Sequence, residues 1–250
     1  MTNHEKLIAN NLKETINDLT QTVLEKATDI SAPPCTFFLK DGRPTGMFDT
    51  SILLRMISKN VKKDMDKGKV EFDNQFEMAD CIMHLFQKTI GSFYRWVCKE
   101  EGINGIIQTG EVNQIQGETS SKEVALEHTR KIGKVSMQSK EVRAKVIEEL
   151  GLEELTCWSL VYEQKVGDKI AFGISNYPFE DNNGAKSWIG AKFVDTPVDD
   201  ALEGKIPIGA IATAVHTLDV IKDVYFSKVK ENDDNDFSWS ALHNMIKAEG

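Results

Sequence analysis

Residues 72–98, FDNQFEMADCIMHLFQKTIGSFYRWVC, carry the strongest helical pattern of the chain. Apolar side chains recur there at alternating steps of four and three, and a second, mostly apolar row widens the stripe. The first row is Phe72, Phe76, Ala79, Met83, Phe86, Ile90, Phe93 and Val97, and the second is Met78, Ile82, Leu85, Thr89 and Trp96. A helix that is apolar over so wide an arc is buried on several sides in a globular protein. The sequence therefore predicts a long central helix over residues 72–98.

Other helical patterns surround this segment, so residues 1–150 are predicted to form a mainly helical body. The expected helices cover residues 7–27, a segment from Asp49 or Thr50 to about Met65, and two segments that begin near Ser120 and Ser139. Residues 35–39 are a candidate strand, which ends in an Asp-Gly turn at Asp41 and Gly42. Residues 108–121 are polar and contain two glycines, and we expect an exposed loop there.

Residues 151–250 have a different pattern. Segments 156–162 and 169–175 are rich in β-branched and aromatic residues and flank a turn, which predicts a β-hairpin. Residues 187–194 are a third candidate strand, and residues 208–229 have the apolar spacing of a helix. We therefore expect an α+β protein with two regions. The helical body is followed by residues 151–250, which are expected to form a small antiparallel sheet with a covering helix.

The composition is that of an ordinary globular protein. The chain has 250 residues, of which 40% are hydrophobic and 28% charged. No apolar run approaches the roughly 18–20 residues of a membrane-spanning helix, and no secretory signal precedes the first helix. The four cysteines are scattered, which favours free thiols over a disulfide or zinc framework. These features predict a soluble cytoplasmic protein that does not associate with a membrane.

The net charge of −9 is unevenly distributed. Residues 151–250 contain nine Lys, no Arg and seventeen Asp or Glu, so this region is expected to have an acidic surface. The N-terminal region is nearly neutral, and it contains two helical segments rich in cations. Two basic helices can contact a phosphate backbone, although a solvated lysine face explains the same letters. The candidate nucleic-acid-binding residues are Lys59, Lys62, Arg130 and Arg143.

Catalytic and cofactor signatures are absent from the sequence, which has no phosphate-binding glycine loop, nucleophile elbow or zinc-protease motif. Glu77, Cys81 and His84 share one helical face and are chemically legitimate zinc ligands. No second cluster supplies further ligands, so a surface Asp–His pair beside a buried cysteine explains them better. We therefore expect no cofactor and no catalytic residue, although a site assembled from non-adjacent residues would not be visible in the sequence.

The C-terminus offers a second candidate site, for protein contacts. The acidic run 231–236 precedes apolar residues spaced as one face of a short helix, and those proposed to bind a partner are Phe237, Trp239, Leu242 and Met245. The same segment can also fold back onto its own chain. Similarly, the aromatic segment 156–195 can stack on single-stranded nucleic acid or fill the core.

Three functional classes follow from these patterns. The first is a non-catalytic binding, regulatory or assembly protein that acts through contacts with a protein partner or with a second copy. The second is a nucleic-acid-binding protein of the single-stranded type, which uses the basic helices or the aromatic hairpin. The third is an enzyme whose site is assembled from distant residues. The identity of a partner or substrate does not follow from the sequence.

Overall fold

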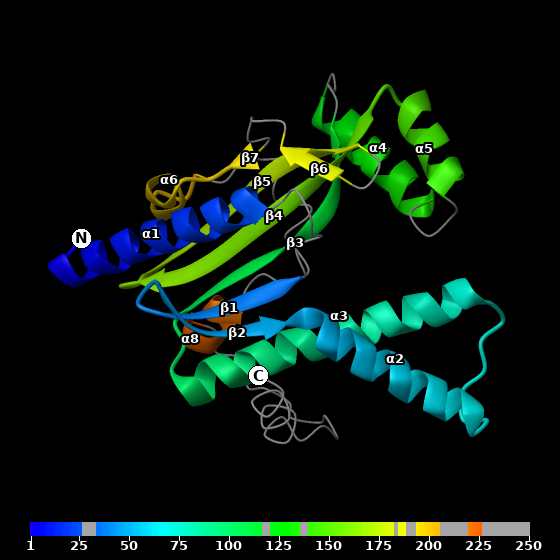
Figure 1. Cartoon of the computed structure of the whole chain (residues 1–250), viewed down its shortest axis with the longest axis horizontal. Helices are drawn as coiled ribbons and strands as arrows, with labels where there is room; N and C mark the ends of the chain where they lie inside the picture. Colours follow the sequence, from blue (N-terminus) through cyan, green and yellow to red (C-terminus); the bar gives the residue numbers. More distant parts are fainter. Residues whose placement is uncertain are drawn as a thin grey trace.

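The computed structural model describes residues 1–26, 34–116, 121–135, 140–182, 185–188, 194–205 and 220–226. In these ranges, helices lie on both faces of one antiparallel sheet (Figure 1). The strands are β1 (Cys35–Lys40), β2 (Arg43–Asp49), β3 (Gly105–Gln116), β4 (Glu153–Val166), β5 (Lys169–Asn182), β6 (Ala185–Trp188) and β7 (Val194–Asp195). The helices are α1 (Asn3–Lys26), α2 (Thr50–Asp66), α3 (Gln75–Glu101), α4 (Lys122–Val135), α5 (Lys140–Glu149), α6 (Val198–Leu202) and α8 (Val220–Phe226). The predicted α+β class is confirmed.

The sheet is larger than expected, and the arrangement of a helical body beside a small C-terminal sheet is not confirmed. Its strand order is β2-β1-β3-β4-β5-β6, with β7 also paired to β5. Strands β1, β2 and β3 come from the first 116 residues, so the sheet crosses the expected boundary at residue 150. The expected loop over 108–121 is wrong for residues 108–116, which belong to β3. Strand β3 accommodates these polar residues because the Glu111 and Asn113 side chains are exposed, while the backbone pairs with β4 throughout.

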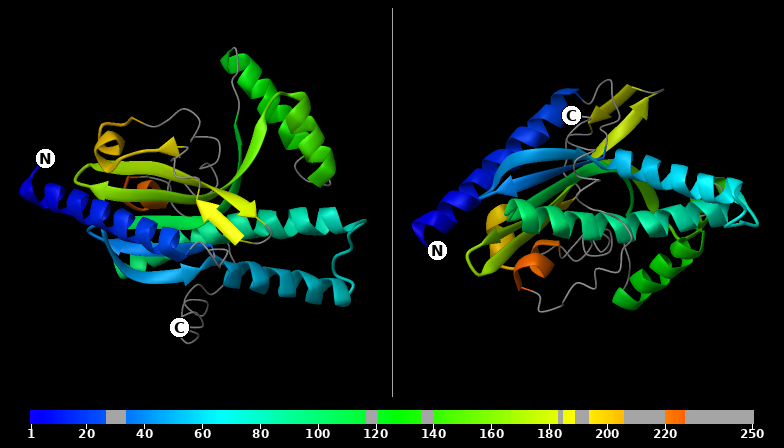
Figure 2. Two further views of the ribbon diagram at one scale, coloured as in Figure 1. Left: turned by 45° about the horizontal axis from the view of Figure 1, so that its top comes forward. Right: turned by 90° about the horizontal axis from the view of Figure 1, so that it is seen from below.

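Alternating side chains bury both faces of the sheet, because successive residues of a strand point to opposite sides. On one face, Leu39 and Ile107 pack with Leu12 of α1, and α6 completes this layer. On the other face, Phe38 and Ile106 pack with residues of α2, α3 and α8. The two views of Figure 2 show these helical layers on either side of the strands. The structure describes part of the predicted covering helix as α8, whose Val220 and Ile221 are buried.

The β1–β2 turn fixes the position of α1. Asp41 and Gly42 both have positive φ, at 50° and 79°, and lie between the paired residues Lys40 and Arg43. This two-residue loop suits the twist of a hairpin. The backbone of Gly42 touches α1 so closely that a Cβ atom would lie 2.6 Å from the carbonyl oxygen of Ile8. Thr15 of α1 donates a hydrogen bond to the Gly42 carbonyl at 2.8 Å.

A cluster of amides joins this turn to the start of β3 and the end of β4. The side chain of Asn104 accepts from the backbone N–H of Asp41 at 2.8 Å and donates to the Asp41 carboxylate at 2.7 Å. Gln164, which is fully buried, donates to the carbonyl oxygen of Asn104 at 2.9 Å. The turn, the α3–β3 junction and β4 are therefore held together at one end of the sheet.

Helix α3 is buried along only half of its length. In its C-terminal half, Ile90, Tyr94 and Val97 are buried against the sheet. Among the side chains that the structure describes between residues 75 and 89, none is buried. The reason is visible in Figure 1, where α2 and α3 extend together beyond the end of the sheet. Burial on several sides, expected for the whole segment, is thus found only where the sheet underlies the helix.

Within the described ranges, no helix combines the length and the apolar character that a membrane span requires.

Replacing Gly173 by alanine tests the packing of β4 against β5. A Cβ atom at Gly173 would overlap the ring of Tyr162, its cross-strand neighbour. That ring is held in place because its hydroxyl donates to the Thr196 carbonyl at 2.8 Å. We expect Gly173→Ala to lower the free energy of unfolding by about 1–3 kcal/mol in a denaturant titration.

The matched control is Gly46→Ala in β2, where an added Cβ meets no atom within 4 Å. This variant should unfold within about 0.5 kcal/mol of the wild type. Equal stability of the two variants would contradict the described packing of Tyr162.

Candidate interface on the α2–α3 hairpin

Helix α2 has a capped start and one buried face. The side chain of Asp49 accepts a hydrogen bond from the Ser51 backbone N–H at 2.8 Å, as an N-cap residue does. The buried residues Leu53, Ile57 and Val61 follow at steps of four and turn one face of α2 toward the core. The rotation of the helix about its axis is therefore fixed.

The opposite face of α2 is basic. Arg55, Lys59, Lys62 and Lys63 are all exposed, and among the residues that the structure describes none of the four forms an ion pair. From residue 55 to residue 63 they extend along about 12 Å of the helix axis. Two of the predicted nucleic-acid-binding residues, Lys59 and Lys62, thus lie side by side on one open surface.

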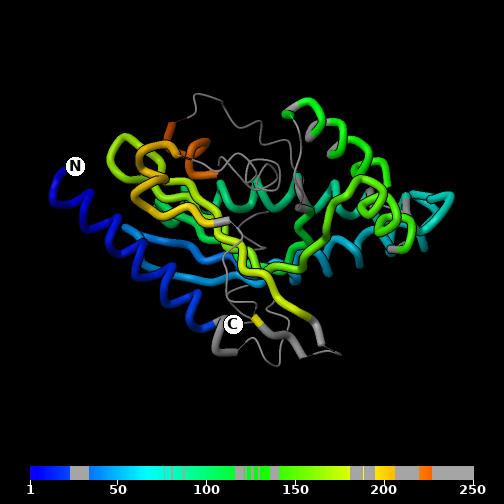
Figure 3. Tube along the Cα trace, turned by 90° about the horizontal axis from the view of Figure 1, so that it is seen from above, coloured from blue at the N-terminus to red at the C-terminus, as the bar shows by residue number. Residues whose placement is uncertain are grey.

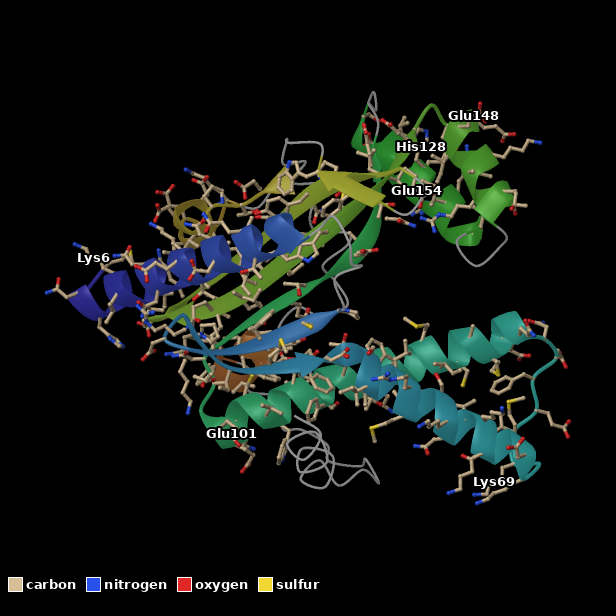
Figure 4. The ribbon with its side chains drawn as sticks, viewed as in Figure 1. Lys6, Lys69, Glu101, His128, Glu148 and Glu154 are labelled. Atoms are coloured by element: carbon tan, nitrogen blue, oxygen red, sulfur yellow. The ribbon has the colours of Figure 1, made fainter. Side chains whose placement is uncertain are left out.

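Acidic residues lie at the free end of the hairpin, which Figure 4 marks by Lys69. The ammonium group of Lys69 lies 3.6 Å from the Asp64 carboxylate, and Asp66 is exposed. Asn74 accepts from the Glu77 backbone N–H at 3.0 Å, and the Glu77 carboxylate accepts from the backbone of Asp73 at 2.9 Å. These bonds begin α3 in the manner of a capping box.

Glu77 therefore has a structural role at the start of α3, separate from the zinc site considered for Glu77, Cys81 and His84. Across the described residues, no group of three His, Cys, Asp or Glu side chains is placed to hold a metal ion.

The other two predicted cations lie on a separate hairpin formed by α4 and α5. Arg130 of α4 is exposed. Arg143 of α5 forms an ion pair with Glu154 at the start of β4, and both side chains are about three-quarters buried. Figure 3 shows the α2–α3 and α4–α5 hairpins at the same end of the molecule, and Figure 1 shows them as separate projections. The charge of Arg143 is thus neutralised within the fold, whereas those of Lys59 and Lys62 are not.

The C-terminal candidates Phe237, Trp239, Leu242 and Met245 lie outside the described residues, so their role in protein binding stays a prediction.

Most aromatic side chains of β4 and β5 lie inside the protein, and Phe172 is half-buried. Trp158, Tyr162 and Tyr177 are each about 1% exposed, and Trp158 packs on Tyr177 with ring centroids 5.3 Å apart. Buried rings cannot stack on the bases of a single strand. The buried rings therefore do not support the aromatic hairpin, which stays a prediction for Phe172 and Trp188, both half-buried.

Three of the cysteines are buried, Cys81 is half-buried, and all four are free. Burial raises the pKa of the Cys157 thiol to about 11. Burial also raises the pKa of Cys98, with a further contribution from the charge of Glu163. The thiolate is the reactive form of cysteine, so neither Cys98 nor Cys157 is activated as a nucleophile.

Two buried or partly buried contacts were not predicted from the sequence. The Glu163 carboxylate accepts from the backbone N–H of Ile221 at 3.0 Å, and Arg95 lies 3.3 Å from Asp223. Both contacts hold α8 against the sheet and α3. No local pattern signals them, because the partners are far apart in the chain.

Comparisons of this chain with protein families, with curated proteins and with solved structures found no match.

The buried thiols predict a loss of stability at alkaline pH. In the unfolded chain a thiol titrates near 9.0, whereas in the fold Cys157 titrates near 11 and Cys98 also above its ordinary value. Above pH 9 the unfolded state therefore binds fewer protons than the folded state, and the free energy of unfolding falls as pH rises. We expect a slope of up to about 1.4 kcal/mol per pH unit for each thiol.

The measurement is a denaturant titration between pH 8 and pH 11 under reducing conditions, for the wild type and for Cys98→Ala with Cys157→Ala. The cavity left by each substitution is the same at every pH, so only the slopes are compared. The variant should lose less stability per pH unit than the wild type. Identical slopes would show that the thiols are not shielded in the fold.

Proposed function

We propose that this protein is a non-catalytic binding protein that contacts nucleic acid through the basic face of α2, defined by Arg55, Lys59, Lys62 and Lys63. The observation that carries the proposal is that these four exposed cations have no ion-pair partner in the described structure. The proposal selects the second of the functional classes that the sequence left open, in the version that uses a basic helix.

The charge of the whole chain makes this face unusual. A protein with a net charge of −9 attracts few polyanions through its overall field. Surface cations in such a protein are readily neutralised by neighbouring acids, as Lys13 is by Asp199 at 2.8 Å. Four unpaired cations on one helix face therefore favour an anionic partner outside the chain.

The position of the basic face suits a phosphate backbone. The four cations lie on a helix that projects beyond the sheet (Figure 1), so an extended polymer can lie along it. Contacts to phosphates fix position without reading the bases. In addition, Trp158, Tyr162 and Tyr177, which were candidates for stacking on bases, are buried elsewhere in the fold. We therefore expect binding with little sequence preference.

A second candidate, binding through protein contacts, is favoured by a separate observation. Met83 on α3 is 41% exposed, although it continues an apolar row that is buried further along the helix. An apolar side chain in that position suits a protein partner better than a phosphate.

The test is the salt dependence of binding to short oligonucleotides of mixed sequence, single-stranded and duplex, followed by fluorescence anisotropy. About four phosphate contacts predict a slope of log K against log salt of about −3.6 on duplex DNA and about −2.8 on a single strand. Replacing Lys59, Lys62 and Lys63 by Gln should reduce the duplex slope to about −0.9 and weaken binding to all sequences alike.

The control removes the same charge from elsewhere. Lys6, Lys40 and Lys99 are exposed and lie outside α2, and their replacement by Gln should leave the slope unchanged. Equal loss in both triple variants would show that only the net charge matters. The absence of salt-dependent binding by the wild type would overturn the proposal.

A further inference from the structure

The side of α3 that faces the sheet continues beyond the sheet without a cover. Ile90, Tyr94 and Val97 occupy this side and are at most 3% exposed. Met83 lies two turns before Ile90 on the same side, yet it is 41% exposed. Ala79, one turn earlier, is half-buried. The uncovered face is therefore an extension of the core-facing row rather than an isolated surface methionine.

In this half of α3, Met78, Ile82 and Phe86 are partly buried against the core, whereas Met83 is exposed. The main helical neighbours of α3 are α2, which lies alongside it, and α8. Buried Val220 and Ile221 of α8 cluster with Val97 and Cys98, near the C-terminal end of α3. A helix with apolar residues around most of its circumference is stable in water when several sides are covered. The free half of α3 lies beside α2, and its Met83 side chain is left exposed.

The hairpin also carries a gradient of charge along its length. Near the sheet, segments 50–63 and 81–92 contain Arg55, Lys59, Lys62, Lys63 and Lys88 and no acid. Toward the free end, residues 64–80 contain six acids against Lys67 and Lys69. Two such hairpins attract each other when they are antiparallel, because the acidic free end of each then lies beside the basic, sheet-proximal part of the other. A parallel arrangement would place the two basic, sheet-proximal parts side by side, where they repel each other.

We propose that two copies of this chain associate through their α2–α3 hairpins, with the Met83 side of one α3 packed antiparallel on the same side of the other. Met83 lies near the middle of the free segment 75–89, so a two-fold axis beside Met83 places each free segment along its counterpart. Such an isologous contact is self-complementary. It gives the free half of α3 the cover that the sheet gives the other half, and it forms a four-helix arrangement.

This inference goes beyond the proposed function: its apolar contact lies on α3, although the α2 cations add to the attraction between the hairpins. The α2 cations lie on the side opposite Leu53, Ile57 and Val61, so they stay outside the contact around Met83. The dimer would present two basic faces to a nucleic acid. Each proposal can fail without the other, since the oligomeric state is measured with no nucleic acid present.

The experiment measures the mass of the full chain by sedimentation velocity and light scattering across a dilution series. We expect a dimer that dissociates on dilution and is weakened by salt. Met83→Glu should weaken the dimer by about 100-fold or more, because it removes apolar burial and places two carboxylates beside the two-fold axis. Its melting temperature at concentrations where both proteins are monomeric should match that of the wild type.

Leu85→Glu is the matched control. Leu85 is 38% exposed and lies two residues from Met83, which places it about 200° away around the helix. This variant should dimerise like the wild type. In a Cys81→Ser background, Met83→Cys should form a disulfide between copies under mild oxidation, and Leu85→Cys should not.

Three results would overturn the inference. One is a wild-type chain that stays monomeric at every concentration. Another is a dimer that survives Met83→Glu, or that Leu85→Glu disrupts equally. The third is a wild-type monomer whose melting temperature falls on Met83→Glu, which would assign the cover of this face to another segment of the same chain.

Discussion

The contact between Asn104 and Asp41 fixes one end of the sheet. Asn104 stands at the junction of α3 and β3, and its amide both accepts from and donates to Asp41 in the β1–β2 turn. Gln164 brings the end of β4 to the same point, in space left by the missing side chain of Gly105. The turn in turn supports α1 through Gly42. Leaving a buried amide without its hydrogen-bond partner lowers the stability of the fold by about 1–3 kcal/mol. This cluster therefore favours the one arrangement in which the β1–β2 turn, β3 and β4 meet, and with it the position of α1.

The sequence predicted the helices well and the sheet poorly, for a physical reason. Helical spacing is local, so α1, α2 and α3 were expected close to where they occur. The Asp-Gly turn was also recognised, because positive φ restricts the residues allowed there. Strand β3 was missed since its polar half is held by backbone pairing to β4, and the pairing partner lies more than thirty residues further along the chain. For the described side chains of residues 75–89, the predicted full burial of α3 is not found, and Met78, Ile82 and Phe86 are only partly buried. Periodicity shows which side of a helix is apolar, but not how far the covering sheet extends.

For the candidate site, the sequence predicted which residues carry positive charge more reliably than which of them lie free on one surface. Lys59 and Lys62 were chosen for charge. They share an open side because the cap of α2 and its buried face, which includes Leu53, Ile57 and Val61, fix the rotation of the helix. Arg143 was chosen by the same criterion, yet its partner Glu154 lies in another element and neutralises it. Whether a cation is free is thus a tertiary property. The exposure of Met83 is also a tertiary property, because a methionine at this helical position is equally compatible with a buried core residue.

The α4–α5 hairpin interrupts a pair of strands whose alignment does not depend on it. Strands β3 and β4 stay in register up to Gln116 and Glu153, so residues 117–152 form an excursion from a β-hairpin. Once the strand ends are held together, the loop-closure entropy of such an excursion grows only with the logarithm of its length, about 0.6 kcal/mol for each doubling. Insertions, deletions or a wholly different element are thermodynamically cheap at this position. At this position, the outline of the fold can therefore change over evolutionary time while the paired strands are preserved.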